Sequence, residues 1–266
     1  MNKSQKEARV KELYEKYPYP SRTVNSKEDV LYFASWVAKI FSEKKEFWQG
    51  KSVLDLGCGT GELAVALALL GAKVNGIDFS SSSIKKAKDL AKKFGVASVT
   101  HFFEENILSF ASEKKFDVVI ALGSLHHTID ARSAFSIAAK CVKKDGLIVV
   151  GLYNKYSRFR HRVRRAILFA FAGNNVEKRI TVGKKIFGAK VNSDGTTKEV
   201  SAAWLADKYG QVHESYHSVS QVIKWFDEEG FSFVSSKPTF EVPVVDEIKW
   251  LLKGKEAFFV MVGKKK

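Results

Sequence analysis

The chain has 266 residues, of which 45% are hydrophobic and 12% aromatic, so it can bury a sizeable core and global disorder is excluded. Its formal net charge of +15 is high for this length and suggests either a polyanionic partner or a basic solvated surface. The two cysteines, Cys58 and Cys141, are far apart in the sequence, which argues against a disulfide framework.

The sequence also bears on the compartment. The first 16 residues are charged throughout and lack the apolar core of a signal peptide. No apolar run reaches the roughly 18 residues that a membrane-spanning helix needs. Together with the cysteine usage, these features predict a soluble, cytoplasmic protein.

Residues 1–50 are predicted to form an N-terminal helical arm, with helices at residues 4–16 and 29–41. The segment Tyr17-Pro18-Tyr19-Pro20 ends the first helix, because each proline disfavours helical backbone at the residue before it. Tyr19 on this stiff segment is a candidate substrate contact if the arm acts as a lid. The alternative is that its ring only pins the arm to the domain.

From residue 51 the pattern changes to short apolar segments that alternate with amphipathic ones. The apolar segments are predicted strands at residues 52–56, 73–77, 98–103, 116–122 and 146–153. The segments between them contain predicted helices at residues 61–70, 80–94 and 130–143. This alternation predicts an α/β fold with a doubly wound, mostly parallel sheet, whose core is residues 51–153.

The rest of the chain is predicted to hold an insertion and the completion of the core. Residues 154–217 break the alternation and are interpreted as a basic, partly helical insertion after the fifth strand. Between residues 155 and 190 there are eleven Lys or Arg and the single acid Glu177. Residues 218–266 complete a seven-stranded sheet, with helices at 218–229 and 248–252, strands at 231–235 and 257–262, and a frayed tail at 264–266.

The first predicted strand ends in a glycine-rich loop, Asp55-Leu56-Gly57-Cys58-Gly59-Thr60-Gly61. Glycines permit positive φ and leave no Cβ between the main chain and a ligand, and the following helix N-terminus favours an anionic group. Asp78, 21 residues after Gly57, ends the second strand and can accept two hydrogen bonds from a ribose diol. The loop therefore predicts a nucleoside-containing cofactor. Its G-x-G-x-G spacing differs from the dinucleotide fingerprint G-x-G-x-x-G.

The loop, Asp78 and the run Gly123-Ser124-Leu125-His126-His127 resemble the motifs of class I S-adenosylmethionine-dependent methyltransferases. The resemblance covers roughly residues 51–153 and implies a Rossmann-like methyltransferase fold that converts S-adenosylmethionine to S-adenosylhomocysteine. It implies that the glycines receive the amino-acid end of the cofactor and that Asp78 holds the ribose. An amide, Asn106, stands where the family often has an acid beside the adenine. The expected cofactor-binding residues are Asp55, Gly57, Cys58, Gly59, Gly61, Asp78, Phe79, Asn106, Ile107, Leu122 and Gly123.

Methyl transfer from a sulfonium chiefly needs alignment, and a general base is needed only if the nucleophile is protonated. His126 and His127 follow the fourth strand and Tyr153 ends the fifth, so these three are the catalytic candidates. The alternative for either histidine is a purely structural role, in which its side chain only forms a hydrogen bond with the loop backbone. Asn154, beside Tyr153, is a candidate substrate contact.

The run His213-Glu214-Ser215-Tyr216-His217 matches the zinc-protease pattern H-E-x-x-H, which works only on a helix. Ser218 and Ser220 place the helix start after the motif, and a third ligand is missing, so no metal site is predicted. His213, Glu214, His217 and Arg158 are candidate substrate contacts. The alternative is that these polar groups, with Asp207, fold the insertion over the active site.

Three functions remain open from the sequence. The main hypothesis is methyl transfer to a small molecule. The second is an RNA methyltransferase, for example of tRNA, that binds through Arg158, Arg160, Arg162, Arg164 and Arg165. The third is a cofactor-binding or partner-binding protein without catalysis. Peripheral membrane contact of the arginine segment is a weaker alternative, and the acceptor atom and the oligomeric state stay open.

Overall fold

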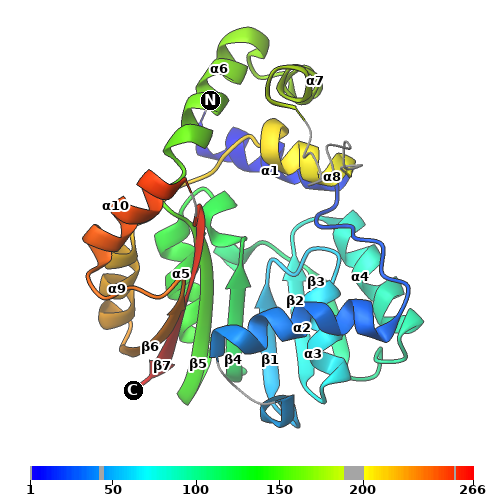
Figure 1. The fold of residues 1–266 in the computed structure, drawn as a ribbon. Helices are drawn as coiled ribbons and strands as arrows, with labels where there is room; N and C mark the ends of the chain where they lie inside the picture. Colours follow the sequence, from blue (N-terminus) through cyan, green and yellow to red (C-terminus); the bar gives the residue numbers. More distant parts are fainter. Residues whose placement is uncertain (1, 42–44, 189–200, 255) are drawn as a thin grey trace.

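The computed structural model describes residues 2–41, 45–188, 201–254 and 256–266, and within them the strands form one sheet in the order β3-β2-β1-β4-β5-β7-β6 (Figure 1). The strands are β1 Ser52–Leu56, β2 Lys73–Asp78, β3 Thr100–Glu104, β4 Phe116–Leu122, β5 Val142–Tyr153, β6 Phe231–Lys237 and β7 Phe258–Lys265. Neighbours from β3 to β5 are parallel, whereas β7 is antiparallel to both β5 and β6. The predicted doubly wound, mostly parallel seven-stranded sheet is confirmed.

Helices cover both faces of the sheet. The longer helices of the core are α2 Lys27–Phe41, α3 Glu62–Leu69, α4 Ser81–Lys93, α5 Ala131–Lys140, α9 Val219–Glu228 and α10 Pro243–Lys253. Short 3-10 turns are η1 Lys45–Trp48, η2 Ile107–Ser109 and η3 Leu125–His127. Along β1, Val53 packs with residues of α2, α3 and α4, whereas Leu54 and Leu56 pack with residues of α5 and α9. Because both faces are buried, the central strands are almost continuously apolar.

Two boundaries at the β5 edge differ from the sequence prediction. Strand β5 begins at Val142 rather than at residue 146, because Val142 pairs with Phe116 and the register then shifts before Val118. The predicted frayed tail at residues 264–266 is wrong. Lys264 pairs with Leu147 on β5 and with Ser232 on β6, so neighbours on both sides satisfy its backbone while its side chain stays exposed.

The second helix that the sequence places in the arm, α2, packs on a face of the sheet instead. The rest of the arm and the insertion gather beyond the carboxyl ends of the parallel strands (Figure 1). They comprise α1 Lys3–Lys16, α6 Phe159–Ala172, α7 Val176–Phe187, α8 Ala202–Leu205 and the π-helical turn η4 Ala206–Gly210. Buried Arg179 of α7 donates hydrogen bonds to the carbonyl oxygens of Gly210 and Gln211, which fastens α7 to the end of η4. Residues 189–200 of the insertion lie outside the described residues. None of the described helices is long and apolar enough to cross a membrane.

The glycine loop joins β1 to α3 as predicted, and its last glycine has a packing role. Gly61 precedes α3 with a left-handed φ of 84°. A Cβ on Gly61 would lie 2.7 Å from the Cβ of Ala87, so α4 packs directly against the loop backbone. The close approach of α4 to the loop therefore depends on the missing side chain at Gly61.

We predict that Gly61→Ala lowers the free energy of unfolding by about 2–4 kcal/mol, because it combines left-handed strain with overlap against Ala87. Urea denaturation measures this change. Gly95→Ala is the matched control, since Gly95 has a φ of 73° and nothing within 4 Å of its missing Cβ. It is expected to cost only about 1–2 kcal/mol. Equal losses in the two variants would contradict the packing role.

Candidate active site

A cavity of about 600 Å³ opens at the carboxyl ends of β1, β2, β4 and β5. Its size is typical of small-molecule sites, and it lies where the strand order reverses between β1 and β4, the usual ligand position in such sheets. Residues of the arm and the insertion complete its wall. Most of the expected cofactor-binding residues line it: Asp55, Gly57, Cys58, Gly59, Asp78, Phe79, Asn106, Ile107, Leu122 and Gly123. Gly61 does not, because it faces α4.

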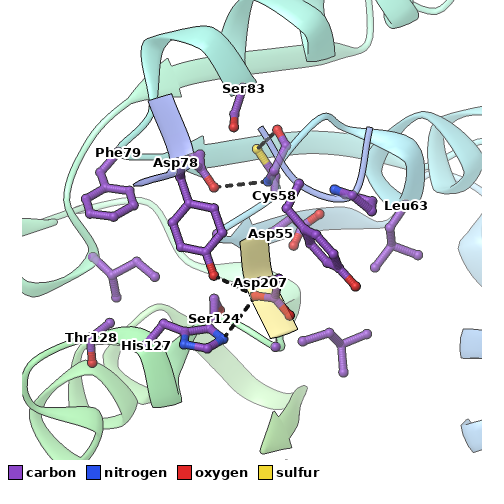
Figure 2. Close-up of a pocket in the computed structure, with 18 of the residues that line it drawn as sticks. Asp55, Cys58, Leu63, Asp78, Phe79, Ser83, Ser124, His127, Thr128 and Asp207 are labelled. Atoms are coloured by element: carbon purple, nitrogen blue, oxygen red, sulfur yellow. Dashed lines mark hydrogen bonds and ion pairs between the residues drawn. The ribbon is translucent and has the colours of Figure 1, made fainter. Parts of the chain in front are cut away.

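Two carboxylates from neighbouring strands face this cavity (Figure 2). The backbone N–H groups of Gly59 and Ser80 donate to the Asp78 carboxylate at 3.1 and 2.9 Å, which fixes its orientation. Burial nevertheless raises the pKa of Asp78 to about 6. Burial, followed by the charge of Asp78, raises the pKa of Asp55 to about 7. Both acids therefore favour a cation or hydrogen-bond donors in the cavity.

The position expected to contact the adenine is arranged differently from the sequence expectation. The side-chain oxygen of Asn106 accepts a hydrogen bond from the Leu108 N–H at 2.9 Å, and its amide nitrogen donates to Glu7 of α1 at 2.6 Å. Both polar ends of the amide are thus engaged within the protein. Two acids missed by sequence reasoning, Glu7 and Glu105, line the cavity beside it. The signal that identifies Glu105 in the sequence is its position just after the third strand, directly before Asn106. Nothing in the sequence of α1 singles out Glu7.

His127 is the histidine that lines the cavity. Its Nδ1 lies 3.1 Å from the carbonyl oxygen of His213, and because a carbonyl only accepts, Nδ1 carries the proton and Nε2 is the acceptor. Burial lowers the pKa of His127, which keeps the ring neutral near pH 7. Figure 2 shows His127 and Asp207 pointing toward each other, with Nε2 3.7 Å from Asp207 Oδ1.

His126 lies behind the cavity wall. It is fully buried, and neither ring nitrogen has a hydrogen-bond partner among the described residues. Its ring centroid lies 3.8 Å from that of Tyr153, which does line the cavity. Burial holds the pKa of His126 well below its usual value and the pKa of Tyr153 well above its own. His126 is therefore a neutral packing group, and Tyr153 keeps its phenol proton.

The arm and the insertion meet at the cavity through Tyr14 and Asp207. The Tyr14 hydroxyl donates to Asp207 Oδ1 at 3.1 Å and accepts a hydrogen bond from the Gln211 side chain at 2.8 Å. Burial, followed by the Asp207 charge, raises the pKa of Tyr14 well above its usual value, so the phenol remains a donor. In the sequence, Tyr14 is indistinguishable from any apolar residue on the inner face of α1.

Five of the six predicted substrate contacts do not line the cavity; they are Asn154, Arg158, His213, Glu214 and His217. Their side chains are engaged in protein contacts, for example the hydrogen bond from Asn154 to buried Glu247 at 2.6 Å. The H-E-x-x-H run forms an irregular segment before α9, as expected from Ser218. Among the described residues, no group of three or more His, Cys, Asp or Glu could hold a metal ion. The sixth contact, Tyr19, does line the cavity.

Glu214 is the centre of a buried ionic cluster. Its carboxylate, 1% exposed, lies 2.9 Å from Arg158 and from Arg165, 3.1 Å from His161, and accepts a hydrogen bond from Tyr216 at 2.8 Å. Although burial opposes it, the hydrogen bond with His161 and the two guanidinium charges hold the pKa of Glu214 well below its usual range. Two of the five predicted RNA-binding arginines are therefore turned inward, and Arg160, Arg162 and Arg164 remain exposed.

The arm also crosses directly over the glycine loop. The carbonyl oxygen of Tyr19 accepts a hydrogen bond from the Thr60 N–H at 3.1 Å, and it would lie 2.2 Å from a Cβ on Gly59. The Arg22 N–H donates to buried Glu62 at 3.0 Å. The positive φ of 53° and the close carbonyl explain why residue 59 is a glycine.

Comparisons with known proteins agree with this geometry. The sequence profile of a methyltransferase domain family matches residues 48–202. Ubiquinone biosynthesis O-methyltransferases from Alkalilimnicola ehrlichii and Rhizobium leguminosarum are 33% and 31% identical, over 47% and 59% of this chain and 48% and 60% of theirs. The chain thus spans about half to three-fifths of these curated relatives. A magnesium protoporphyrin IX methyltransferase structure from Synechocystis PCC 6803 with bound S-adenosylhomocysteine superposes with a TM-score of 0.54 at 18% identity, covering 99% and 95% of the two chains, which shows a shared fold.

The raised pKa of Asp55 predicts how the stability of the ligand-free protein depends on pH. Asp55 ionises near 3.8 in the unfolded chain and near 7 in the folded protein, so between these values the folded state binds the extra proton. Its contribution to stability therefore falls as the pH rises toward 7. We predict that the stability of Asp55→Asn relative to wild type increases by about 2 kcal/mol between pH 5 and pH 8. Urea denaturation at both pH values measures this difference, and a pH-independent difference would refute the shift.

Proposed function

The chain belongs to the methyltransferase domain family, and on that premise we propose that it transfers the methyl group of S-adenosylmethionine to an oxygen of a small, largely apolar acceptor. The observation that carries the proposal is a single cavity with the glycine loop and two desolvated acids at one end and the neutral His127 at the other. The cofactor supplies an electrophilic methyl group. The protein's own groups bind, orient and remove a proton.

The charged residues that line the cavity support S-adenosylmethionine as its ligand. Among the described residues that line the cavity, the acids are Glu7, Asp55, Glu62, Asp78, Glu105 and Asp207, and Arg22 is the single Lys or Arg. This balance favours a cationic ligand such as a sulfonium with an ammonium group. We assign the ribose diol to Asp78 and the amino group to Asp55. Gly57 and Gly59 allow close approach of the methionine end, and Gly123 leaves open space beside it.

The position and protonation of His127 support methyl transfer to a hydroxyl group of the acceptor. With Nδ1–H held by the His213 carbonyl, the lone pair of Nε2 is available to take a proton from an acceptor hydroxyl as the new bond to carbon forms. The protonated phenol of Tyr153 can donate a hydrogen bond to the acceptor but cannot act as the base near pH 7. Asp207, oriented by Tyr14, stabilises the imidazolium that results.

The outer wall of the cavity supports an acceptor with an apolar body. It carries the rings of Tyr19, Tyr32, Phe33 and Phe258 together with Leu63. Flat apolar groups pack well against such rings. The names of the two curated relatives, both O-methyltransferases of ubiquinone biosynthesis, support oxygen as the acceptor atom.

RNA is disfavoured as the acceptor, because the acidic cavity lining would repel phosphates near the reacting methyl group. Arg158 and Arg165 are committed to Glu214 inside the protein. A cofactor-binding protein without catalysis is disfavoured by His127, which lines the cavity and whose Nε2, the unprotonated nitrogen, lies beside Asp207. The two buried free cysteines support the cytoplasmic location expected from the sequence.

We predict that Asp78→Ala weakens S-adenosylhomocysteine binding at least tenfold, because the ribose hydroxyls lose a charged acceptor worth about 1.5–3 kcal/mol. Titration calorimetry measures the dissociation constant. Asp145→Asn is the control, since Asp145 is exposed on β5 and asparagine tolerates its left-handed φ of 60°. Equal affinity of wild type and Asp78→Ala would contradict the ribose assignment.

A second prediction separates the adjacent histidines. His127→Asn is expected to lower kcat by about 10²–10⁴-fold while S-adenosylhomocysteine affinity is kept, because only proton removal is lost. His126→Leu is expected to keep most of the activity, since the ring of His126 makes no hydrogen bond with another described residue. The assay follows labelled methyl transfer to a panel of phenols and hydroxylated quinones, with total tRNA as a separate arm. The reverse ranking, or transfer to tRNA alone, would overturn the proposal.

A further inference from the structure

Helix α10 exposes an apolar face to solvent. Val244, Val245, Ile248 and Leu252 are between 45% and 76% exposed, and their spacing places them on one side of the helix. On the opposite side, Glu247 and Trp250 are buried against the core. The inner face alone therefore accounts for the docking of α10 on the domain. The outer face is apolar without serving the fold.

The start of α6 adjoins the end of α10. The Arg160 guanidinium comes within 3.3 Å of the position that a Cβ on Gly254, directly after α10, would occupy. Figure 1 shows the two helices meeting at the corner where the insertion leaves the core. Phe159 and Val163, one turn apart on α6, are 55% and 44% exposed. We call the following exposed residues of the two helices the α10–α6 face: Val244, Val245, Ile248, Lys249, Leu252 and Lys253 on α10, and Phe159, Arg160, Arg162 and Val163 on α6.

The charges of this face are predominantly basic. Lys249 and Lys253 flank the apolar residues of α10, and Arg160 and Arg162 flank Phe159 and Val163 on α6, which contains no acid. Arg164 is directed instead toward Phe187 of α7. Helix α10 holds two acids: Glu247 is buried, and the carboxylate of Asp246 is occupied by the backbone N–H groups of Glu241 and Val242 and by Lys249. An apolar helix face edged by Lys and Arg is typical of segments that lie in the plane of a membrane interface.

We propose that the α10–α6 face binds the surface of an anionic phospholipid bilayer. Val244, Val245, Ile248 and Leu252 enter the boundary between headgroups and acyl chains, and the surrounding lysines and arginines contact the lipid phosphates. The proposal does not rest on the methyl-transfer function, because none of these residues lines the cavity.

Two other occupants fit the face less well. A twofold dimer would bring each basic edge against its own copy, so like charges would repel across an isologous interface. RNA would find phosphate partners but no use for the aliphatic side chains of α10, since bases stack on aromatic rings. A surface that joins an apolar layer to anionic groups matches both features of the face.

Flotation of the full chain with phospholipid vesicles tests the proposal. One vesicle preparation contains phosphatidylcholine alone, and the other contains phosphatidylcholine with phosphatidylglycerol. The wild-type chain is expected to float with the second preparation, less so as the salt concentration rises, and to float weakly or not at all with the first. The double variant Ile248→Asp, Leu252→Asp is expected to lose at least about tenfold in partitioning. Lys249→Gln with Lys253→Gln is expected to weaken binding to anionic vesicles only.

The control is Phe103→Asp. Phe103 is 46% exposed, but it lies on β3, at the opposite edge of the sheet from β6, so this variant is expected to partition as wild type does. Circular dichroism verifies that all variants are folded. The proposal is overturned if the wild-type chain stays soluble with anionic vesicles at low salt, or if the control loses as much as the double variant. It is also overturned if the double variant loses tRNA binding while vesicle binding is unchanged.

Discussion

Two buried carboxylates at the ends of adjacent parallel strands are the constraint on which the rest of this structure depends. Strand pairing alone places Asp55 and Asp78 at the carboxyl ends of β1 and β2, where parallel geometry brings chain ends to one edge. Residues of the arm and the insertion line the cavity beside both acids, and burial raises both pKa values. The ionised forms of both acids are therefore destabilised in the ligand-free protein, and a cationic, hydroxyl-rich ligand stabilises them.

The insertion also contributes much of the high positive charge of the chain. The insertion brings many basic residues, yet its inner side is organised around one acid, Glu214, which holds Arg158, Arg165 and His161. Breaking such a buried pair leaves an uncompensated charge, so the cluster specifies how α6 lies on the segment before α9. The cations left over face outward on α6. One carboxylate thus offsets part of the positive charge inside the insertion, while the surface of α6 is basic and the lining of the cavity is acidic.

The two adjacent histidines illustrate how position within a short turn decides chemistry. Both are in η3, and both are neutral because burial penalises the imidazolium. His127 has one nitrogen fixed by a carbonyl and the other toward the cavity, so its proton-accepting site is defined. His126 is enclosed by aromatic rings and serves as packing. Identical side chains one residue apart therefore differ in function through access and hydrogen bonding, not through their intrinsic basicity.

The sequence by itself determined the α/β class, the sheet of seven strands and the glycine loop, and its resemblance to a family predicts the ligand roles of Asp55 and Asp78. These features follow from local patterns, since hydrophobic period, glycine spacing and the residue at a strand end are set within a few positions of the chain. Only the tertiary structure decided that Glu7, Tyr14, Asp207 and Phe258 share one cavity, and that Arg158 and Glu214 bind each other instead of lining it. Those outcomes depend on how distant elements pack, and no local pattern encodes which side chain of a helix will meet a residue nearly 200 positions away.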